Sequence, residues 1–239
     1  MKRVPLEPGF LLSVRPYRET SALLEALTAG HGRVGLVARG VRGAKSRLRG
    51  LLQPFQPLLL SWSEGGELGT LTGAEAAGRP ATLAGEAVFS GWYLNELVLR
   101  LLPRRDAHPE LYSSYCEALA ALGGEGGVRA LRVFELHLLA ELGYAVHVPE
   151  TTEPESWYGY DPEGGLRLAE PGPDAYRGAS LLALAEESLQ TEESLRDARR
   201  LLRAALKPHL GDRALRTPEM LRALRGIRDS GSGIREERK

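Results

Sequence analysis

The first eighty residues show short runs in which apolar and polar positions alternate. Alternation with a period of two is typical of β-strands, because successive side chains point to opposite faces of a sheet. Glycine-containing turns, HG and EGG, separate some of these runs and supply the permissive backbone that a chain reversal needs. The pattern predicts five strands and no helix in this region, at residues 10–17, 21–29, 33–40, 55–62 and 67–74.

Five short strands in so few residues predict a small closed barrel, because closure removes long exposed strand edges. The five-stranded member of this class is the OB-fold, whose grooved face and connecting loops receive oligonucleotides or oligosaccharides. We expect residues 1–80 to form such a domain. Phe10, Phe55 and Trp62 are expected in the barrel core, the more common position of strand aromatics, with stacking on bases as the alternative.

After Pro80 the apolar residues recur at intervals of three and four, the period of an amphipathic helix. The predicted fold class is therefore α+β with several domains: an N-terminal five-stranded OB-fold β-barrel, then a mostly α-helical domain over residues 81–226. Residues 227–239 are short of apolar side chains and are expected to form a flexible tail. The helical stripes consist of Leu94, Leu97, Val98, Leu101 and Leu102, then Leu131, Phe134, Leu138 and Leu142, then Leu195, Leu202 and Leu206.

An acidic segment rich in proline and glycine interrupts the helical region, and its composition excludes a single helix. Residues 150–194 carry 11 acidic and 2 basic side chains, a net charge of −9. We expect a loop-rich acidic insertion at about residues 145–177 that contains one hairpin and does not contact nucleic acid.

The formal net charge is zero, with 31 Lys and Arg against 31 Asp and Glu, so the overall charge indicates no particular partner. The charge is nevertheless uneven, because residues 1–80 carry 11 basic and 6 acidic side chains and the rest of the chain carries 20 and 25. Much of the basic excess lies in the stretch ARGVRGAKSRLRGLLQPF, residues 38–55, which has no acid. Its five cations are Arg39, Arg42, Lys45, Arg47 and Arg49.

Cations spaced along a loop between two barrel strands can pair with phosphates whatever the base sequence. We therefore predict nucleic-acid binding at this loop, extended by Arg15, Arg18 and Arg33. Because aromatic residues are scarce in this region, backbone charge should dominate and sequence preference should be weak. The alternative is a solvated loop whose charges only keep the chain soluble.

A second group of cations follows one face of a later helix, at i, i+4, i+7 and i+11. One interpretation is a solvated face whose cations lie favourably near the helix C-terminus. The other is a site for an anionic ligand, either DNA or an acidic peptide. The four cations are Arg196, Arg200, Arg203 and Lys207, with Arg199 beside them.

The sequence presents no catalytic constellation. Its five histidines lack a metal-ligand spacing such as HExxH, and no GxSxG, P-loop or GxGxxG is present. Glu96, next to Asn95 in an apolar helix, is assigned to a capping or interhelical hydrogen bond rather than to catalysis. The single cysteine, Cys116, excludes an intramolecular disulfide and is expected to pack as a small buried hydrophobe. We predict that the chain is not an enzyme.

No apolar run reaches the roughly 18 residues that a membrane span needs, and the N-terminal residues lack the apolar stretch of a signal peptide. These features and the single cysteine lead us to expect a cytoplasmic protein.

Six motifs stand in the order and spacing of the RecO family of bacterial recombination mediators, which the chain resembles over about residues 9–222. The resemblance implies an OB-fold followed by a helical domain. It also implies a non-enzymatic role in DNA repair and homologous recombination. The motifs are RPYRETS (15–21), GRVGLVARGVR (32–42), LQPFQPLLL (52–60), YLNEL (93–97), LRVFELHLLAELGY (131–144) and ALKPHLG (205–211).

The resemblance implies particular activities and partners. A protein of this family is expected to bind single- and double-stranded DNA, to anneal complementary strands, and to help RecR load RecA onto strands coated by single-strand-binding protein (SSB). It would lie at the nucleoid, with a possible functional link to RecF. The second hypothesis is a DNA-binding regulatory protein that does not anneal strands, and a nuclease is the third.

Many members of the family hold a zinc ion with four cysteines between the LGY motif and the later helices. This sequence has no cysteine there, so we expect no metal and no cofactor. The stability of the insertion must then come from packing, for which Trp157, Tyr158 and Tyr160 are the candidates.

The resemblance also implies that the helical domain receives the acidic C-terminal tail of SSB. Arg132 is the predicted cation for the tail carboxylates, with its helix held in the core by Leu131 and Phe134 while its guanidinium reaches the surface. Arg129 shares its face, and the cations from Arg196 to Lys207 would neutralise the remaining acids of the tail. The alternative is that Arg132 only forms an exposed pair with a nearby acid such as Glu135.

Overall fold

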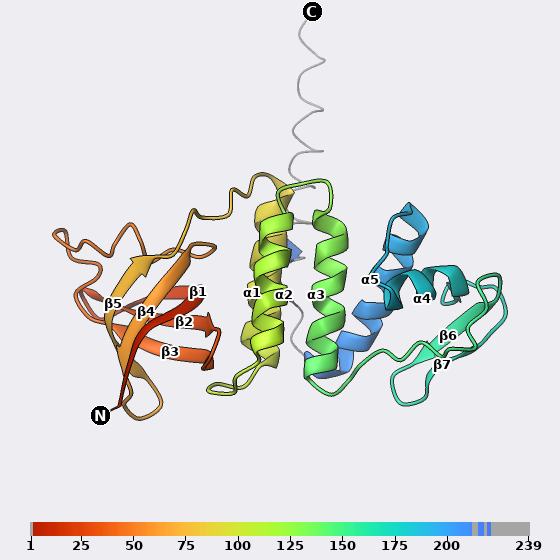
Figure 1. Cartoon of the computed structure of the whole chain (residues 1–239), viewed down its shortest axis with the longest axis horizontal. Helices are drawn as coiled ribbons and strands as arrows, with labels where there is room; N and C mark the ends of the chain where they lie inside the picture. The colour runs from red at the N-terminus through yellow and green to blue at the C-terminus, as the bar shows by residue number, and fades with distance from the viewer. Residues whose placement is uncertain (1, 212–214, 218, 221–239) are drawn as a thin grey trace, which may run out of the picture.

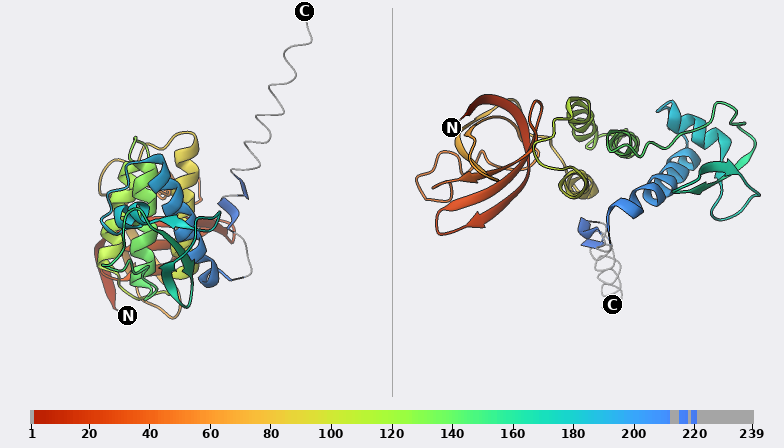
Figure 2. Two further views of the ribbon diagram at one scale, coloured as in Figure 1. Left: turned by 90° about the vertical axis from the view of Figure 1, so that its right-hand side faces the viewer. Right: turned by 90° about the horizontal axis from the view of Figure 1, so that it is seen from below.

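The chain folds into three parts that follow one another along the long axis of the molecule (Figure 1). A computed structural model describes residues 2–211, 215–217 and 219–220. A β-barrel lies at one end, three helices lie in the middle, and two further helices with a small sheet lie at the other end (Figure 2). The expected tail at 227–239 lies outside the described residues.

The N-terminal part is a closed barrel of five strands in the order β1-β2-β3-β5-β4, in which β4 pairs back with β1. All neighbouring pairs are antiparallel except β3 and β5, which are parallel. This barrel, followed by helices, confirms the predicted OB-fold and the α+β class. The strands are β1 (Arg3–Tyr17), β2 (Ser21–Thr28), β3 (Gly32–Ala38), β4 (Pro57–Ser63) and β5 (Gly69–Ala76).

Strand β1 has apolar side chains on both faces, because one face lines the barrel and the other packs on the helices. Leu11 points into the barrel core, whereas Phe10 and Leu12 belong to the core of the helical part. The register of β1 with β2 shifts between Leu11 and Ser13, so Leu12 is the extra residue of a β-bulge. The barrel is therefore joined to the helices through a shared apolar interface.

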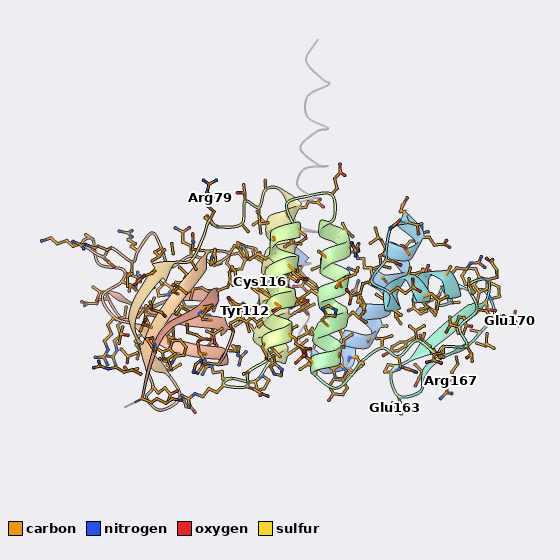
Figure 3. All side chains as sticks on the ribbon, viewed as in Figure 1. Arg79, Tyr112, Cys116, Glu163, Arg167 and Glu170 are labelled. Atoms are coloured by element: carbon orange, nitrogen blue, oxygen red, sulfur yellow. The ribbon has the colours of Figure 1, made fainter. Side chains whose placement is uncertain are left out.

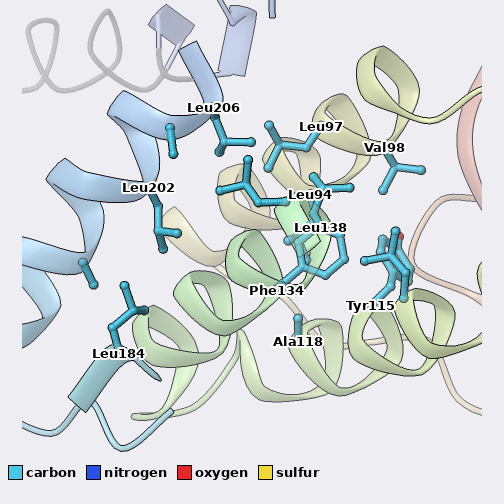
Figure 4. Close-up of a cluster of buried hydrophobic side chains, with 14 of the residues drawn as sticks. Leu94, Leu97, Val98, Tyr115, Ala118, Phe134, Leu138, Leu184, Leu202 and Leu206 are labelled. Atoms are coloured by element: carbon cyan, nitrogen blue, oxygen red, sulfur yellow. The ribbon is translucent and has the colours of Figure 1, made fainter. Parts of the chain in front are cut away.

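Three helices form the middle of the molecule, and a proline or a glycine marks one end of each. Pro103 follows α1, Pro109 is the first residue of α2, and Gly143 with φ 82° follows α3. Leucine side chains from α1, Phe134 of α3 and Tyr115 of α2 meet in one core (Figure 4). The helices are α1 (Glu86–Leu101), α2 (Pro109–Ala121) and α3 (Gly127–Glu141).

The C-terminal part combines two helices with a three-stranded sheet of order β7-β6-β8. The acidic insertion is thus more ordered than a loop with one hairpin. Tyr158 is buried and its hydroxyl accepts a hydrogen bond from the Glu153 amide, whereas Trp157 and Tyr160 are half-buried. The elements are β6 (Trp157–Asp161), β7 (Gly165–Leu168), β8 (Tyr176–Arg177), α4 (Gly178–Ala185), α5 (Glu192–Leu206) and the 3₁₀ turn η1 (Lys207–His209).

The structure confirms one of the three aromatic assignments to the barrel core and corrects two. Trp62 is buried inside the barrel. Phe10 is also buried, but its ring lies 5.4 Å from that of Tyr115 on α2, measured between centroids. Phe55 packs half-buried against the helical core. Local alternation does not reveal that helices cover the outer face of β1, where Phe10 lies, or that the loop before β4 turns Phe55 toward the same helices.

A pair of hydrogen bonds connects the barrel to the helices at the β1 bulge. The Asn95 side-chain amide on α1 donates to the Leu12 carbonyl over 3.0 Å, and the Tyr115 hydroxyl donates to the Asn95 side-chain oxygen over 2.6 Å. Burial raises the pKa of Tyr115, so the phenol stays protonated and remains a donor. The only asparagine in the chain is thus a buried connector between the two parts.

The neighbouring Glu96 connects α1 to a segment near the end of the described chain. Its carboxylate accepts hydrogen bonds from the Arg216 amide over 2.9 Å and from the Thr217 amide over 3.0 Å. Burial alone would raise the pKa of Glu96, but these two bonds, the Thr217 hydroxyl and the nearby Arg100 together lower it. These contacts agree with the assignment of Glu96 to a capping or interhelical hydrogen bond rather than to catalysis.

Replacing Asn95 should weaken the connection between the two parts. In Asn95→Leu, the Leu12 carbonyl and the Tyr115 hydroxyl lose their buried partner, at a cost of about 1–3 kcal/mol each. We expect the free energy of unfolding in urea to fall by about 2–5 kcal/mol. The control is Gln190→Leu, which changes an exposed amide and should stay within about 0.5 kcal/mol of the parent. Equal stability of the two variants would contradict this role of Asn95.

Candidate nucleic-acid interface

The cationic loop, residues 39–56 between β3 and β4, is anchored on the barrel by its apolar residues. Val41 and Leu52 are buried in the barrel core, and Leu48 and Leu51 are half-buried against it. Because these side chains point inward, the cations between them are turned outward. All five predicted loop cations are exposed, namely Arg39, Arg42, Lys45, Arg47 and Arg49.

Four of these cations have no hydrogen bond or ion pair to any described residue, which leaves their charge uncompensated by protein acids. The fifth, Arg42, donates from its guanidinium to the carbonyls of Arg18 and Glu19 over 3.2 and 3.4 Å. Its backbone amide also donates to the Thr20 carbonyl over 2.8 Å. Arg42 therefore attaches the loop to the turn between β1 and β2.

The loop and this turn enclose a shallow hollow of about 380 Å³. The Arg18 guanidinium lies 5.1 Å from the centre of the Tyr17 ring, and Arg39 lines the same hollow. Arg15 is exposed, has no ion pair with a described residue, and lies two positions before Tyr17 on β1, which places both on one face of the strand. Predicted residues from β1 and the loop thus meet at one surface.

The structure corrects the placement of Arg33. Its guanidinium donates to the Leu99 carbonyl on α1 and lies 3.8 Å from the Glu25 carboxylate, so it points into the junction with the helices. Burial lowers the pKa of Arg33, while Glu25 opposes that shift. Arg33 pairs with Leu27 across β2 and β3, and Leu27 packs on the helical core. Paired residues share a face of the sheet, so Arg33 must face the helices as well.

Arg132 is also corrected, because its guanidinium does not reach the surface. The side chain is only 8% exposed and forms an ion pair with the buried Glu135 over 2.9 Å. The Tyr93 hydroxyl on α1 donates to the same carboxylate over 2.6 Å. Burial raises the pKa of Glu135, and Arg132 opposes that shift. The expected alternative, a pair with Glu135, is present, but it is buried rather than exposed, because α3 packs against both α1 and α5.

The cations of α5 divide into two kinds. Arg200 forms an ion pair with Asp197 over 3.2 Å, and its guanidinium lies 4.8 Å from the centre of the Tyr176 ring, so it holds the insertion. Arg199, which is next to these four cations in the sequence, interacts electrostatically with the buried Glu135. Three predicted cations are exposed and have no hydrogen bond or ion pair from their side chains to any described residue, namely Arg196, Arg203 and Lys207.

Arg129 on α3 is exposed as well, and its guanidinium donates to the Glu187 carbonyl over 2.8 Å. It therefore retains its charge at the surface while being fixed to the segment after α4. Within the described chain, no helix is long and apolar enough to span a membrane.

The zinc site that the resemblance associates with many family members does not fit this chain. Residues 145–177 contain no cysteine, and the described residues contain no group of three or more His, Cys, Asp and Glu placed to hold a metal. Tyr158 and Tyr176 of the sheet are instead buried in the core, and Arg177 adds an ion pair with Glu155 over 2.9 Å and lies 4.9 Å from the centre of the Trp157 ring. Cys116 lies half-buried on α2 beside Tyr112 (Figure 3), and burial raises the pKa of its thiol.

These features define the class as a protein in which an OB-fold barrel with an exposed cationic loop is fixed to a helical region. The family profile described as "Recombination protein O N terminal" matches residues 1–79, and the profile described as "Recombination protein O C terminal" matches residues 84–219. The chain belongs to the RecO family.

Several relatives carry the name "DNA repair protein RecO". The protein from Nitrosococcus oceani is 47% identical over 235 residues, which cover 94% of this chain and 96% of the relative. The protein from Methylococcus capsulatus is 43% identical over 228 residues, covering 92% and 94% of the two chains. A protein from Coxiella burnetii is 44% identical over 228 residues, covering 92% and 99%.

Treatment with a metal chelator should not change the stability of this protein. Because arginine–aromatic and ion-pair contacts hold the insertion, prolonged treatment with EDTA should not change the melting temperature by more than the experimental error. A melting temperature that falls on chelation and recovers with added zinc would show that the insertion contains a metal site. Differential scanning fluorimetry with and without added zinc makes this comparison.

Proposed function

We propose that this protein is a non-enzymatic mediator of DNA repair and homologous recombination that binds DNA through the cationic loop. The observation that carries the proposal is the set of exposed loop cations without acidic partners, on a loop that apolar residues anchor to an OB-fold. Unpaired cations recruit phosphates at little cost, because no protein ion pair must first be broken. The four freest cations are Arg39, Lys45, Arg47 and Arg49.

The proposed contacts are with the phosphate backbone, so they serve single and double strands alike. Arg15 and Arg18 extend the surface along β1, and Arg42 positions the loop against the turn. Family membership supports the further steps of annealing complementary strands and of helping RecR load RecA onto SSB-coated strands, with RecF as a possible further partner. A mediator with these partners would act in the cytoplasm, at the nucleoid.

For the acidic tail of SSB, we propose the exposed cations of the helical domain as the receptor. Arg196, Arg203 and Lys207 on α5 can pair with carboxylates, and Arg129 adds a cation on α3. The buried Arg132 and the half-buried Arg200 support this surface by fixing α3 and the insertion, and they are not offered as contacts with the tail.

The loop assignment predicts a change in salt dependence. In the triple variant Lys45→Ala, Arg47→Ala and Arg49→Ala, the slope of log affinity against log salt for single-stranded DNA should decrease in magnitude by about 2, at roughly 0.7 per lost phosphate contact. Duplex binding should weaken as well, whatever the sequence. Fluorescence anisotropy over a salt series measures both. An unchanged slope would remove the loop from the interface, and the melting temperature should stay near that of the parent because the three side chains are exposed.

The assignment of the α5 cations to the SSB tail predicts that their removal slows annealing only when the strands are coated by SSB. In the triple variant Arg196→Ala, Arg203→Ala and Lys207→Ala, annealing of SSB-coated complementary strands should slow several-fold, whereas annealing of bare strands should stay near the parent rate. The loop variant is the matched control, because it should slow both reactions. Equal losses on bare and coated strands would instead assign these cations to DNA. If the parent protein binds DNA but accelerates neither reaction, the alternative of a non-annealing DNA-binding protein is favoured.

A further inference from the structure

An exposed tryptophan lies at the junction between the barrel and the helices. Trp92 on α1 is 40% exposed, in contrast to Trp62, which is 3% exposed. Its ring meets that of Phe55 edge to face, with centroids 5.2 Å apart and planes at 67°. One ring comes from the end of the cationic loop and the other from the helical domain, so the pair exists only in the assembled protein.

The position of the Phe55 ring is fixed by an unfavourable backbone conformation. Phe55 has φ 65°, which a residue with a bulky side chain rarely adopts. The Ala81 amide donates to the Phe55 carbonyl over 3.0 Å, which ties the linker before α1 to this residue. Strained residues of this kind persist where the surroundings over-determine them, and they are concentrated at binding sites.

A glycine makes room for the ring. A Cβ atom at Gly91 on α1 would lie 2.9 Å from Cε1 of Phe55 and 2.8 Å from a methyl group of Leu83. Any larger residue at position 91 would push Phe55 away from Trp92. Gly91, Leu83 and the strained backbone together hold the two aromatic rings as a preformed unit.

Cations lie on both sides of Phe55 along the chain, and one of them, Arg79, lies in the linker that leads to the helix of Trp92. Phe55 follows Arg49 by six residues, a separation of at most about 21 Å. Arg79 precedes Ala81 by two residues, is exposed, and has no hydrogen bond or ion pair with any described residue. Figure 3 shows Arg79 projecting away from the linker between the barrel and α1. Phe55 therefore lies, along the chain, between two cations that have no partner among the described residues.

We propose that Phe55 and Trp92 form a stacking site for a base of single-stranded DNA, with Arg79 and the end of the cationic loop pairing with the flanking phosphates. The inference rests on the proposed DNA-binding function and adds a site that distinguishes single-stranded from double-stranded DNA. An exposed aromatic face accepts any base, because every base has a π-face. Bases within a duplex are already stacked on one another and are not available to it. The flanking cations favour a nucleic acid over an apolar peptide as the occupant.

Binding of a single-stranded oligonucleotide and of its duplex to three variants tests the site. Trp92→Ala should weaken binding of the single strand about five- to a hundredfold, with an unchanged salt slope and nearly unchanged duplex binding. Trp92→Tyr retains an aromatic ring and should recover most of the affinity. Leu168→Ala removes an exposed apolar side chain on β7 and should bind as the parent does.

Tryptophan fluorescence gives a second measurement that does not depend on the stability of the alanine variant. The oligonucleotide should quench the emission of the parent, and Trp92→Phe should lose most of that quenching while it still binds. If the parent binds DNA but Trp92→Ala binds the single strand equally well, the stacking site is wrong and the cationic loop is unaffected. If single-strand and duplex binding weaken equally, Trp92 does not distinguish single-stranded from double-stranded DNA. If the parent binds no DNA, the proposed function itself fails.

Discussion

The two-sided packing of β1 is the constraint on which the rest of the structure depends. Leu11 closes the barrel from inside, while Phe10 and the bulged Leu12 pack into the helical core. The bulge also leaves the Leu12 carbonyl to Asn95, so an apolar interface and a buried hydrogen bond coincide at one position. This joint fixes the barrel against α1 and α2, and through them it fixes the relation between the cationic loop and the aromatic pair.

Two acids of the barrel are used in structural contacts rather than in pairing with the cations of the loop. Glu25, on the barrel face that points to the helices, is paired with Arg33 and Arg104. Glu7 accepts a hydrogen bond from the Gly30 amide at the next turn. These carboxylates are committed to structural contacts, whereas the loop contributes no acid of its own. The barrel thus separates its cations into structural ones at the joint and free ones on the loop, which is the distribution that a phosphate-binding surface requires.

In the helical domain, some charged side chains are buried between helices instead of being exposed. Arg132, Glu135 and Tyr93 form a buried cluster between α1 and α3, with Arg199 of α5 near enough to interact. A buried ion pair contributes little net stability, because the desolvation of both charges offsets their attraction. Its geometry is nevertheless specific, and we interpret the cluster as fixing how α1, α3 and α5 meet. The exposed cations of α5 then have defined positions, as a receptor for an acidic partner needs.

The sequence by itself determined what depends on local pattern and composition. Period-two alternation predicted the barrel strands, Pro103 and Gly143 marked helix ends, and the acid-free loop stood out by its charge. The sequence alone likewise shows that the insertion lacks the cysteines of the zinc site. The direction of individual side chains was different, because it depends on which surfaces meet. Arg33, Arg132 and Arg200 are structural only because helices or the insertion cover them, and Phe55 meets Trp92 only because the barrel docks on α1. Such contacts join residues far apart in the sequence, so no local period encodes them, and only the tertiary structure decided them.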